Sequence, residues 1–231
     1  MIVRRVSSAL HLISQPDHAA LAGRIMRRWR PLQSAERRAT ILLAIEEHDN
    51  GWRELDDAPM VDPSSGRVFD FVDVPARHRQ AVWPRGIARL AEEPWAAALV
   101  AQHAITVYDR YRPEAEWRDF FLNVSATRDS LVAQARRTQA DLEVDYPFVR
   151  IGDLVSLIFC NRWDTQTFGA FTFRREEDDI LVTPDPFAGE RLAIAVTARQ
   201  IADRPYPSDE TLRAALRDAP AVTLTGTIAG G

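Results

Sequence analysis

The segment from 151 to 160, Ile-Gly-Asp-Leu-Val-Ser-Leu-Ile-Phe-Cys, is the most restrictive feature of the 231-residue sequence. Drawn as a helix it is apolar on nearly all sides, and such a helix is buried inside a protein. Asp153 is its only charged residue. A buried carboxylate needs a cation or several hydrogen bonds, and Arg150 or Arg162 could supply the cation. The segment therefore predicts a core helix over 146–163 that carries a polar site.

The charged residues exclude several classes of function. All 29 basic residues are arginine, so the chain has no lysine for a Schiff base or a phosphate-binding P-loop. Together with 33 acidic residues they give a net charge of −4. The sequence has no basic block of the kind that nucleic-acid binding needs. A single cysteine, Cys160, excludes a disulfide framework and a cysteine-built zinc site.

The sequence also predicts where the protein works. Its first residues, Met1 to Arg5, lack the features of a signal peptide. The longest apolar run, which ends at Ala101, is much too short to cross a membrane. We therefore expect a cytoplasmic protein whose partner is a small-molecule substrate, with neither nucleic acid nor membrane involved.

The hydrophobic pattern predicts one domain over 1–231, with a helical metal-binding core over about 14–163 and a β/α addition over about 164–231. The expected fold class is mainly α: a helical bundle with a small C-terminal antiparallel β addition, α+β overall. Residues 53–74 are rich in Asp, Pro, Ser and Gly and predict a long loop, with a short strand at 69–72. The first 14 residues predict an edge strand or hairpin. Six helices are expected from residues 14, 34, 75, 94, 113 and 146; Gly51 should end the second, and Pro84 should kink or split the third.

Several ionisable side chains share helix faces with apolar ones. His18 lies on the stripe of Leu21 and Ile25, and His48 lies on the stripe of Ile41 and Ile45. His103, Asp49 and, more weakly because of Pro84, His78 also face inward. One such histidine is more often a satisfied core residue than a ligand. Several from different helices, together with Asp153, indicate a site for a divalent metal ion.

The order His18, His48-Asp49, His78, His103 and Asp153 resembles the HD-domain superfamily of helical metalloproteins. Its signature is a histidine, a His-Asp pair and a distant aspartate, and the histidines between resemble its two-metal branches. In addition, the segments 15–19, 47–52 and 152–157 look like a bacterial family catalogued as a domain of unknown function, over nearly the whole chain.

The resemblance implies an HD-like helical bundle with two metal ions. His18, His48, Asp49 and Asp153 would hold the first ion. His78 and His103 would hold the second, with Asp49 bridging; without His78 the site would be mononuclear. The ions would be divalent Fe, Mn, Ni, Co or Zn. Many superfamily members have a lysine where this chain has Trp52, so Arg53 or Arg85 would have to meet a substrate's negative charge.

These implications favour a metal-dependent hydrolase acting on a small phosphorylated or anionic molecule through metal-bound hydroxide. His48 and Asp49 would be catalytic, and Asn50, Trp52 and Arg53 would contact the substrate. One alternative is an HD-type mixed-valent di-iron oxygenase that cleaves a C–H or C–C bond. Another is a non-catalytic metal-binding or regulatory protein. The sequence leaves the substrate, the metal and the oligomeric state open.

Overall fold

The first thirteen residues form the predicted hairpin. In the computed structural model, which describes residues 1–231, β1 (Ile2–Val6) pairs antiparallel with β2 (Ala9–Ile13), and Ser7 lies in the turn with a φ of 51°. Both faces of the hairpin are covered: Ile2 and Ile13, which pair across the strands, belong to the main core, whereas Leu10 and Leu12 belong to a smaller cluster. The hairpin thereby contributes both to a sheet and to the core.

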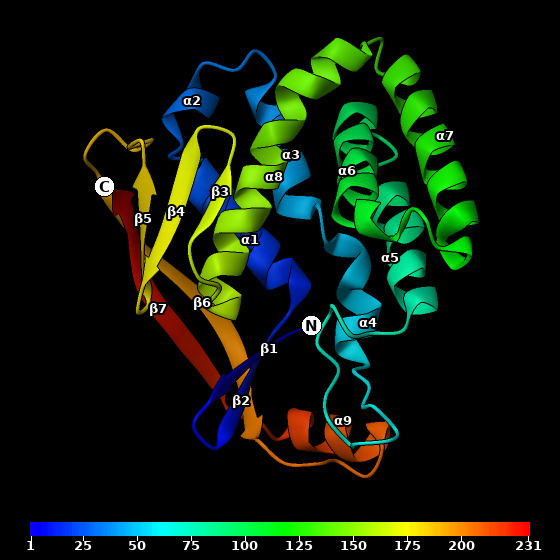
Figure 1. The fold of residues 1–231 in the computed structure, drawn as a ribbon, viewed down its shortest axis with the longest axis vertical. Helices are drawn as coiled ribbons and strands as arrows, with labels where there is room; N and C mark the ends of the chain where they lie inside the picture. The colour runs from blue at the N-terminus through cyan, green and yellow to red at the C-terminus, as the bar shows by residue number, and fades with distance from the viewer.

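The hairpin belongs to a seven-stranded mixed sheet that curves into a half-barrel (Figure 1). The strand order is β1-β2-β6-β7-β5-β4-β3. All neighbours are antiparallel except β5 and β7, which are parallel. The C-terminal strands are β3 (Gln166–Phe168), β4 (Phe171–Glu176), β5 (Asp179–Thr183), β6 (Arg191–Ala202) and β7 (Ala221–Gly230).

The expected mainly-α fold with a small C-terminal antiparallel addition is therefore wrong. The strands form one large mixed sheet in which β2 pairs with β6, for example Ala9 with Ala202. Such pairing joins residues from opposite ends of the chain and leaves no local pattern in the sequence. β6 is also longer than the predicted strand at 192–197, because it continues past Thr197 to pair with the hairpin.

The helices largely follow the predicted order, but several bounds differ: the helices predicted from 34 and 113 begin at 38 and 118, and residues 53–57 of the predicted loop are helical. The second predicted helix ends at Glu47 rather than near Gly51, and α5 is a single helix through Pro84. α8 begins seven residues earlier than predicted, because Thr138 and Asp141 form a capping box. The helices are α1 (Gln15–Met26), α2 (Arg30–Gln33), α3 (Arg38–Glu47), α4 (Arg53–Asp57), α5 (Ala76–Ala88), α6 (Pro94–Val107), α7 (Arg118–Gln134), α8 (Gln139–Asn161) and α9 (Asp209–Arg217).

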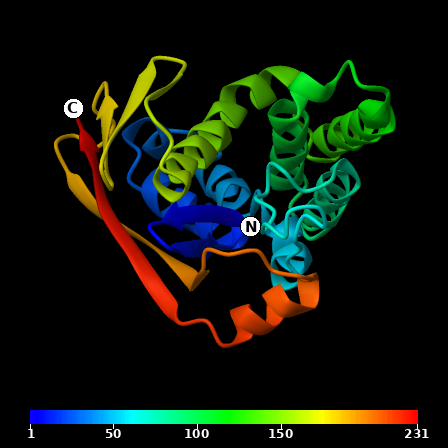
Figure 2. The same ribbon diagram turned by 60° about the horizontal axis from the view of Figure 1, so that its bottom comes forward.

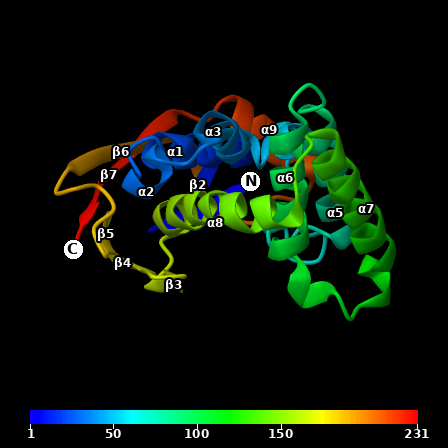
Figure 3. The same cartoon turned by 90° about the horizontal axis from the view of Figure 1, so that it is seen from above.

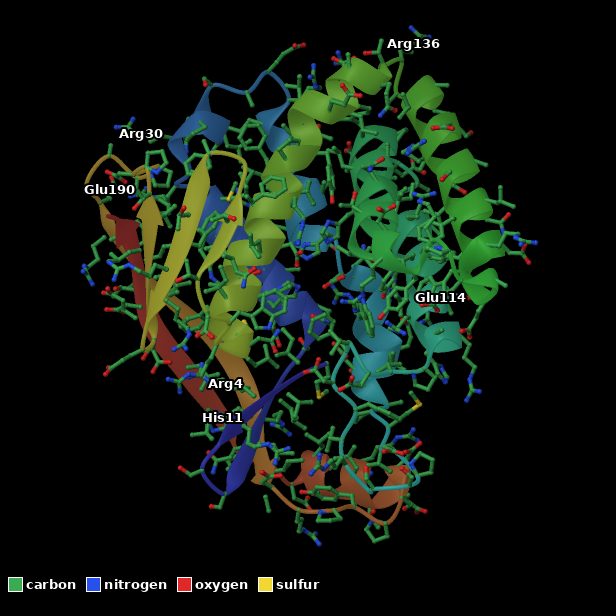
Figure 4. The ribbon with its side chains drawn as sticks, viewed as in Figure 1. Arg4, His11, Arg30, Glu114, Arg136 and Glu190 are labelled. Carbon is green, nitrogen blue, oxygen red and sulfur yellow. The ribbon has the colours of Figure 1, made fainter.

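α1 and α8 connect the sheet with the other helices. Seen from above, α8 runs between the strands on one side and α5, α6 and α7 on the other (Figure 3). α1 packs against α3, α8 and β6, and α8 also contacts α6. Arg28, just before α2, forms an ion pair with Glu190 in the loop before β6 at 2.9 Å. Arg30 and Glu190 are labelled on the left in Figure 4. No helix combines the length and apolar character needed to cross a membrane.

The segment 58–75 is fastened to both ends of the chain. Phe71 N–H donates to the carbonyl of Met1, and Asp70 accepts from Val3 N–H at 2.9 Å. Val61 N–H donates to Asp209 at the start of α9, which lies in front in Figure 2. Residues 69–72 do not form the expected short strand; only Val68, just before them, makes an isolated β-bridge, with Val61. The segment is thus held beside the first helices, with Phe71 at the edge of the core.

Replacing Phe173 of β4 by alanine should lower the free energy of unfolding by about 3–5 kcal/mol. Phe173 is fully buried and stacks on Trp29, which follows α1, with ring centroids 6.2 Å apart. Because sheet and helices share one core, circular dichroism and tryptophan fluorescence should report a single transition. L122A, at an exposed position of α7, is the control and should change the free energy by less than about 1 kcal/mol. Two separate transitions would contradict a shared core.

Candidate metal centre

Five of the six predicted ligands meet in the interior of the protein. They come from four places in the fold: α1, the turn after α3, α6 and α8. All five are at least 93% buried. Their ligand atoms form two groups that share His48, and within each group the atoms lie within 4.8 Å of one another. One group is His18, His48 and Asp49, and the other is His48, His103 and Asp153.

The Nε2 atoms of the histidines point toward the carboxylates. His18 Nε2 lies 2.9 Å from Asp49 Oδ2 and 3.2 Å from His48 Nε2. His48 Nε2 lies 3.6 Å from Asp153 Oδ1, and His103 Nε2 lies 3.6 Å from Asp153 Oδ2. Nitrogen and oxygen donors thus converge on one small volume.

The Nδ1 atoms are held by other partners on the outer side of the cluster. His48 Nδ1 donates to the carbonyl of Ile45 at 2.7 Å. Ser156 Oγ donates to the carbonyl of Asp153, so it accepts from His18 Nδ1, 2.8 Å away. Tyr146 Oη lies 3.3 Å from His103 Nδ1. These bonds place the proton of neutral His18 and His48 on Nδ1, and outer partners of this kind orient histidines that ligate metals.

The positions of the donor atoms show whether the residues fit a metal ion. If both rings are neutral, His18 and His48 turn Nε2 lone pairs toward each other, and the lone pair of His18 also faces Asp49. Such groups repel one another unless a proton or a cation lies between them. Imidazole nitrogens and carboxylate oxygens are donors that divalent transition-metal ions accept. The residues therefore fit a divalent ion.

The pKa values reflect the same attraction for positive charge. Burial alone would lower the pKa of His48, but Asp49 and Asp153 outweigh it and raise that pKa to about 9. Burial lowers the pKa of His103 to about 3. Burial would raise the pKa of the Asp49 and Asp153 carboxyls, but His48 and the neighbouring groups outweigh it and hold both below their usual range. Both carboxylates are therefore ionised at neutral pH.

The turn after α3 places His48 and Asp49 together. His48 follows the last residue of α3, and the chain continues as a short 3₁₀ turn over Asn50–Trp52. A Cβ at Gly51 would lie 2.0 Å from the carbonyl oxygen of Val82. Gly51 thus allows α5 to pack directly on this turn, rather than ending the preceding helix as predicted.

His78 lies outside the cluster. It is on the partly exposed first turn of α5, where its Nε2 accepts a hydrogen bond from Arg77 Nε at 3.2 Å. It belongs to neither group of converging ligand atoms. The structure therefore does not assemble the second set of ligands that the resemblance implied.

A pocket of about 290 Å³ opens beside the cluster. Asp49, His103 and Asp153 line it, whereas His18 and His48 do not. Of the three predicted substrate contacts, Trp52 lines the pocket. Asn50 is buried away from its lining, and Arg53 is on the surface with 54% of its side chain exposed.

Most of the cations that line the pocket are not apparent from the sequence. Arg79, Arg110 and Arg150 line it, and Arg150 Nη1 pairs with Asp153 Oδ2 at 2.5 Å, as one of the two alternatives for Asp153 proposed. Arg79 lies four residues before Trp83 and hence on the same face of α5. That spacing could have identified Arg79 from the sequence. Arg110 lies in a loop turn, where no periodic pattern applies.

Comparisons with known proteins place the chain in a family but give it no function. Residues 1–203 match the family model described as "Protein of unknown function (DUF3891)", and the chain belongs to this family. No curated protein and no solved structure matches it. The expected family of unknown function is confirmed. The assignment to the HD-domain superfamily is wrong, because the matching model is DUF3891 and the fold is a seven-stranded mixed sheet with helices. The order of a few histidines and aspartates was too little to identify a fold.

Replacing Ser156 by alanine should weaken binding of a divalent ion such as Mn²⁺ by about 10–100-fold, the usual effect of losing an outer partner. The change removes the hydroxyl that fixes His18 Nδ1 and leaves every ligand atom in place. The dissociation constant can be measured by competition with a chelating dye. S130A, which removes an exposed hydroxyl on α7, is the matched control. Equal affinities in the two variants would show that Ser156 does not orient His18.

Proposed function

We propose that this member of the DUF3891 family is a metal-dependent hydrolase that acts on a small anionic molecule. One observation carries the proposal: three histidine Nε2 atoms and two carboxylates converge, while other groups hold the Nδ1 atoms. A pocket reaches this cluster, so a small molecule can approach the residues that would hold the ion. The arginines in the pocket lining favour an anionic substrate.

The ligand set favours one ion rather than two. Both groups of ligands include His48, and a neutral imidazole with its Nδ1 proton in place has a single lone pair on Nε2. That lone pair can bind one ion, and His78 is too far from the cluster to complete a second site. Either His18, His48 and Asp49 or His48, His103 and Asp153 would hold this ion. Zn, Fe, Mn, Ni and Co all accept such donors.

When bound, an ion of this kind lowers the pKa of a water molecule and so supplies a nucleophile near neutral pH. The protein supplies the surroundings. Asp49 is ionised and lines the pocket, where its carboxylate can accept a proton from the attacking water. Arg150 holds the Asp153 carboxylate at 2.5 Å. Trp52, Phe71 and Trp83 give the pocket an apolar lining.

The purified protein should contain about one equivalent of a divalent ion, measured by mass spectrometry on untagged protein. H48A should lose it, because His48 belongs to both groups of ligands. H78A is the matched control and should retain it, because His78 contributes no ligand. Two equivalents in the wild type with one in H78A would contradict a single-ion site, and no metal in the wild type would contradict the proposal.

The metal-loaded protein should hydrolyse at least one member of a panel of small phosphomonoesters and carboxylic esters. D49N should reduce the rate at least about 100-fold, with its fold checked by circular dichroism. Oxygen consumption by the iron form without hydrolysis would instead identify an oxygenase. A D49N variant that alters stability alone, with no turnover in the wild type, would identify a non-catalytic metal protein.

A further inference from the structure

We infer that Arg79 and Arg110 bind the oxyanion group of an aromatic substrate whose ring lies in the pocket beside the metal cluster. The inference rests on the proposed function for the reaction, and it adds the substrate class and two residues that determine specificity. The oxyanion is a carboxylate or a phosphate.

Arg79 is buried without a counter-ion. Only 9% of its surface is exposed, and no carboxylate lies within ion-pair distance of its guanidinium. Its Nη1 donates to Tyr111 Oη at 2.9 Å, and its Nε is buried with no hydrogen-bond partner. A buried guanidinium with an unused donor is costly unless it serves to bind something. Its position in the pocket lining indicates that an anion from the pocket is the partner.

The aromatic neighbours of Arg79 fix its position in the absence of a carboxylate. The guanidinium carbon lies 4.9 Å from the ring centroid of Tyr111 and 5.3 Å from that of Trp117. These rings stabilise the cation through their faces but leave its positive charge without a formal counter-charge. The side chain is thus held in place before a ligand arrives, which reduces the entropy cost of binding.

Arg110 brings a second positive charge to the same place. Its Nη2 donates to Tyr111 Oη at 2.8 Å, so two guanidinium groups converge on one phenol oxygen. Burial would raise the pKa of Tyr111, but the two arginines outweigh it and lower that pKa. Arg110 also lacks a carboxylate partner, and its side chain is exposed at the pocket edge. Two adjacent guanidinium groups favour the two or three oxygens of a carboxylate or phosphate.

The third arginine of the pocket does not share this role. Arg150 is neutralised by Asp153 at 2.5 Å, within the cluster itself. The unpaired positive charge of the pocket is therefore confined to Arg79 and Arg110, while Asp49, Asp153 and Arg150 belong to the metal cluster. A ligand that contacts both the two arginines and the metal cluster would place its anionic group at the arginines and another group at the cluster.

The rest of the lining favours a flat apolar body between these groups. Trp52 and Phe71 meet edge to face, with ring centroids 6.4 Å apart, and both line the pocket. Trp83, Leu157 and Trp163 complete an apolar wall. A volume of about 290 Å³ admits one small molecule. An aromatic ring with an oxyanion substituent fits the size, the apolar wall and the charge.

The test measures binding of simple probes to the full-length protein as purified, with metal content determined in parallel. Benzoate and phenyl phosphate carry the two oxyanions, and benzamide is the neutral counterpart of benzoate. Quenching of tryptophan fluorescence and calorimetry both report binding, since Trp52, Trp83 and Trp163 line the pocket. We expect at least one anionic probe to bind about tenfold or more tightly than benzamide. Comparison of the two anions distinguishes a carboxylate from a phosphate site.

R79Q should weaken binding of the preferred anion about 10–100-fold without changing metal content, and R79K should restore part of it. R110Q alters an exposed side chain, so it tests the inference even if R79Q does not fold. R112Q is the matched control, because Arg112 pairs with Asp109 at 2.8 Å and does not line the pocket. Anion binding that R79Q and R110Q leave unchanged, or affinities for benzoate and phenyl phosphate that both fail to exceed that for benzamide, would overturn the inference. If the protein contains no metal but still binds the anion through these arginines, the anion site is supported and only the proposed hydrolase function is refuted.

Discussion

The charge of Asp153 is the constraint on which the centre of this structure depends. The carboxylate is carried into the core by α8, whose residues 151–160 are all buried, and it is 3% exposed. One oxygen faces His48 and the other faces His103 and Arg150. Removing these partners would leave an uncompensated buried charge, so α6, α8 and the turn after α3 must keep their relative positions. The pocket lies where these elements meet around the Asp153 carboxylate, whose buried charge needs partners from each of them.

The sheet matters for the same centre because it positions α1. This helix packs on β6 from one side and on α3 and α8 from the other, and Trp29 just beyond it contacts Phe171, Phe173 and Phe187. The packing of α1 on β6 therefore helps to fix the position of His18. A bundle of helices could have held the other ligands. In this protein the position of His18 depends on strands from both ends of the chain.

The residues that could be predicted are those whose environment is set by a local repeat. His18, His48, His103 and Asp153 lie on apolar helix stripes, and the structure buries all four together. His78 shared only a weak stripe, and its position in the first turn of α5 keeps it at the surface. The sheet depends on pairing between distant strands, which periodicity does not record. Family resemblance inferred from ligand order failed for a related reason, since the order of a few residues does not specify how the chain between them folds.

The hydrogen bond from Phe71 N–H to the carbonyl of Met1 affects how a ligand enters and leaves the pocket. Phe71 is part of the wall, yet its backbone is hydrogen-bonded to the start of β1, and the preceding Asp70 is bonded to Val3. This wall cannot swing on its own like a hinged flap. Displacing it breaks main-chain bonds at the margin of the sheet, so the residence time of a bound molecule is coupled to the fraying of an edge strand.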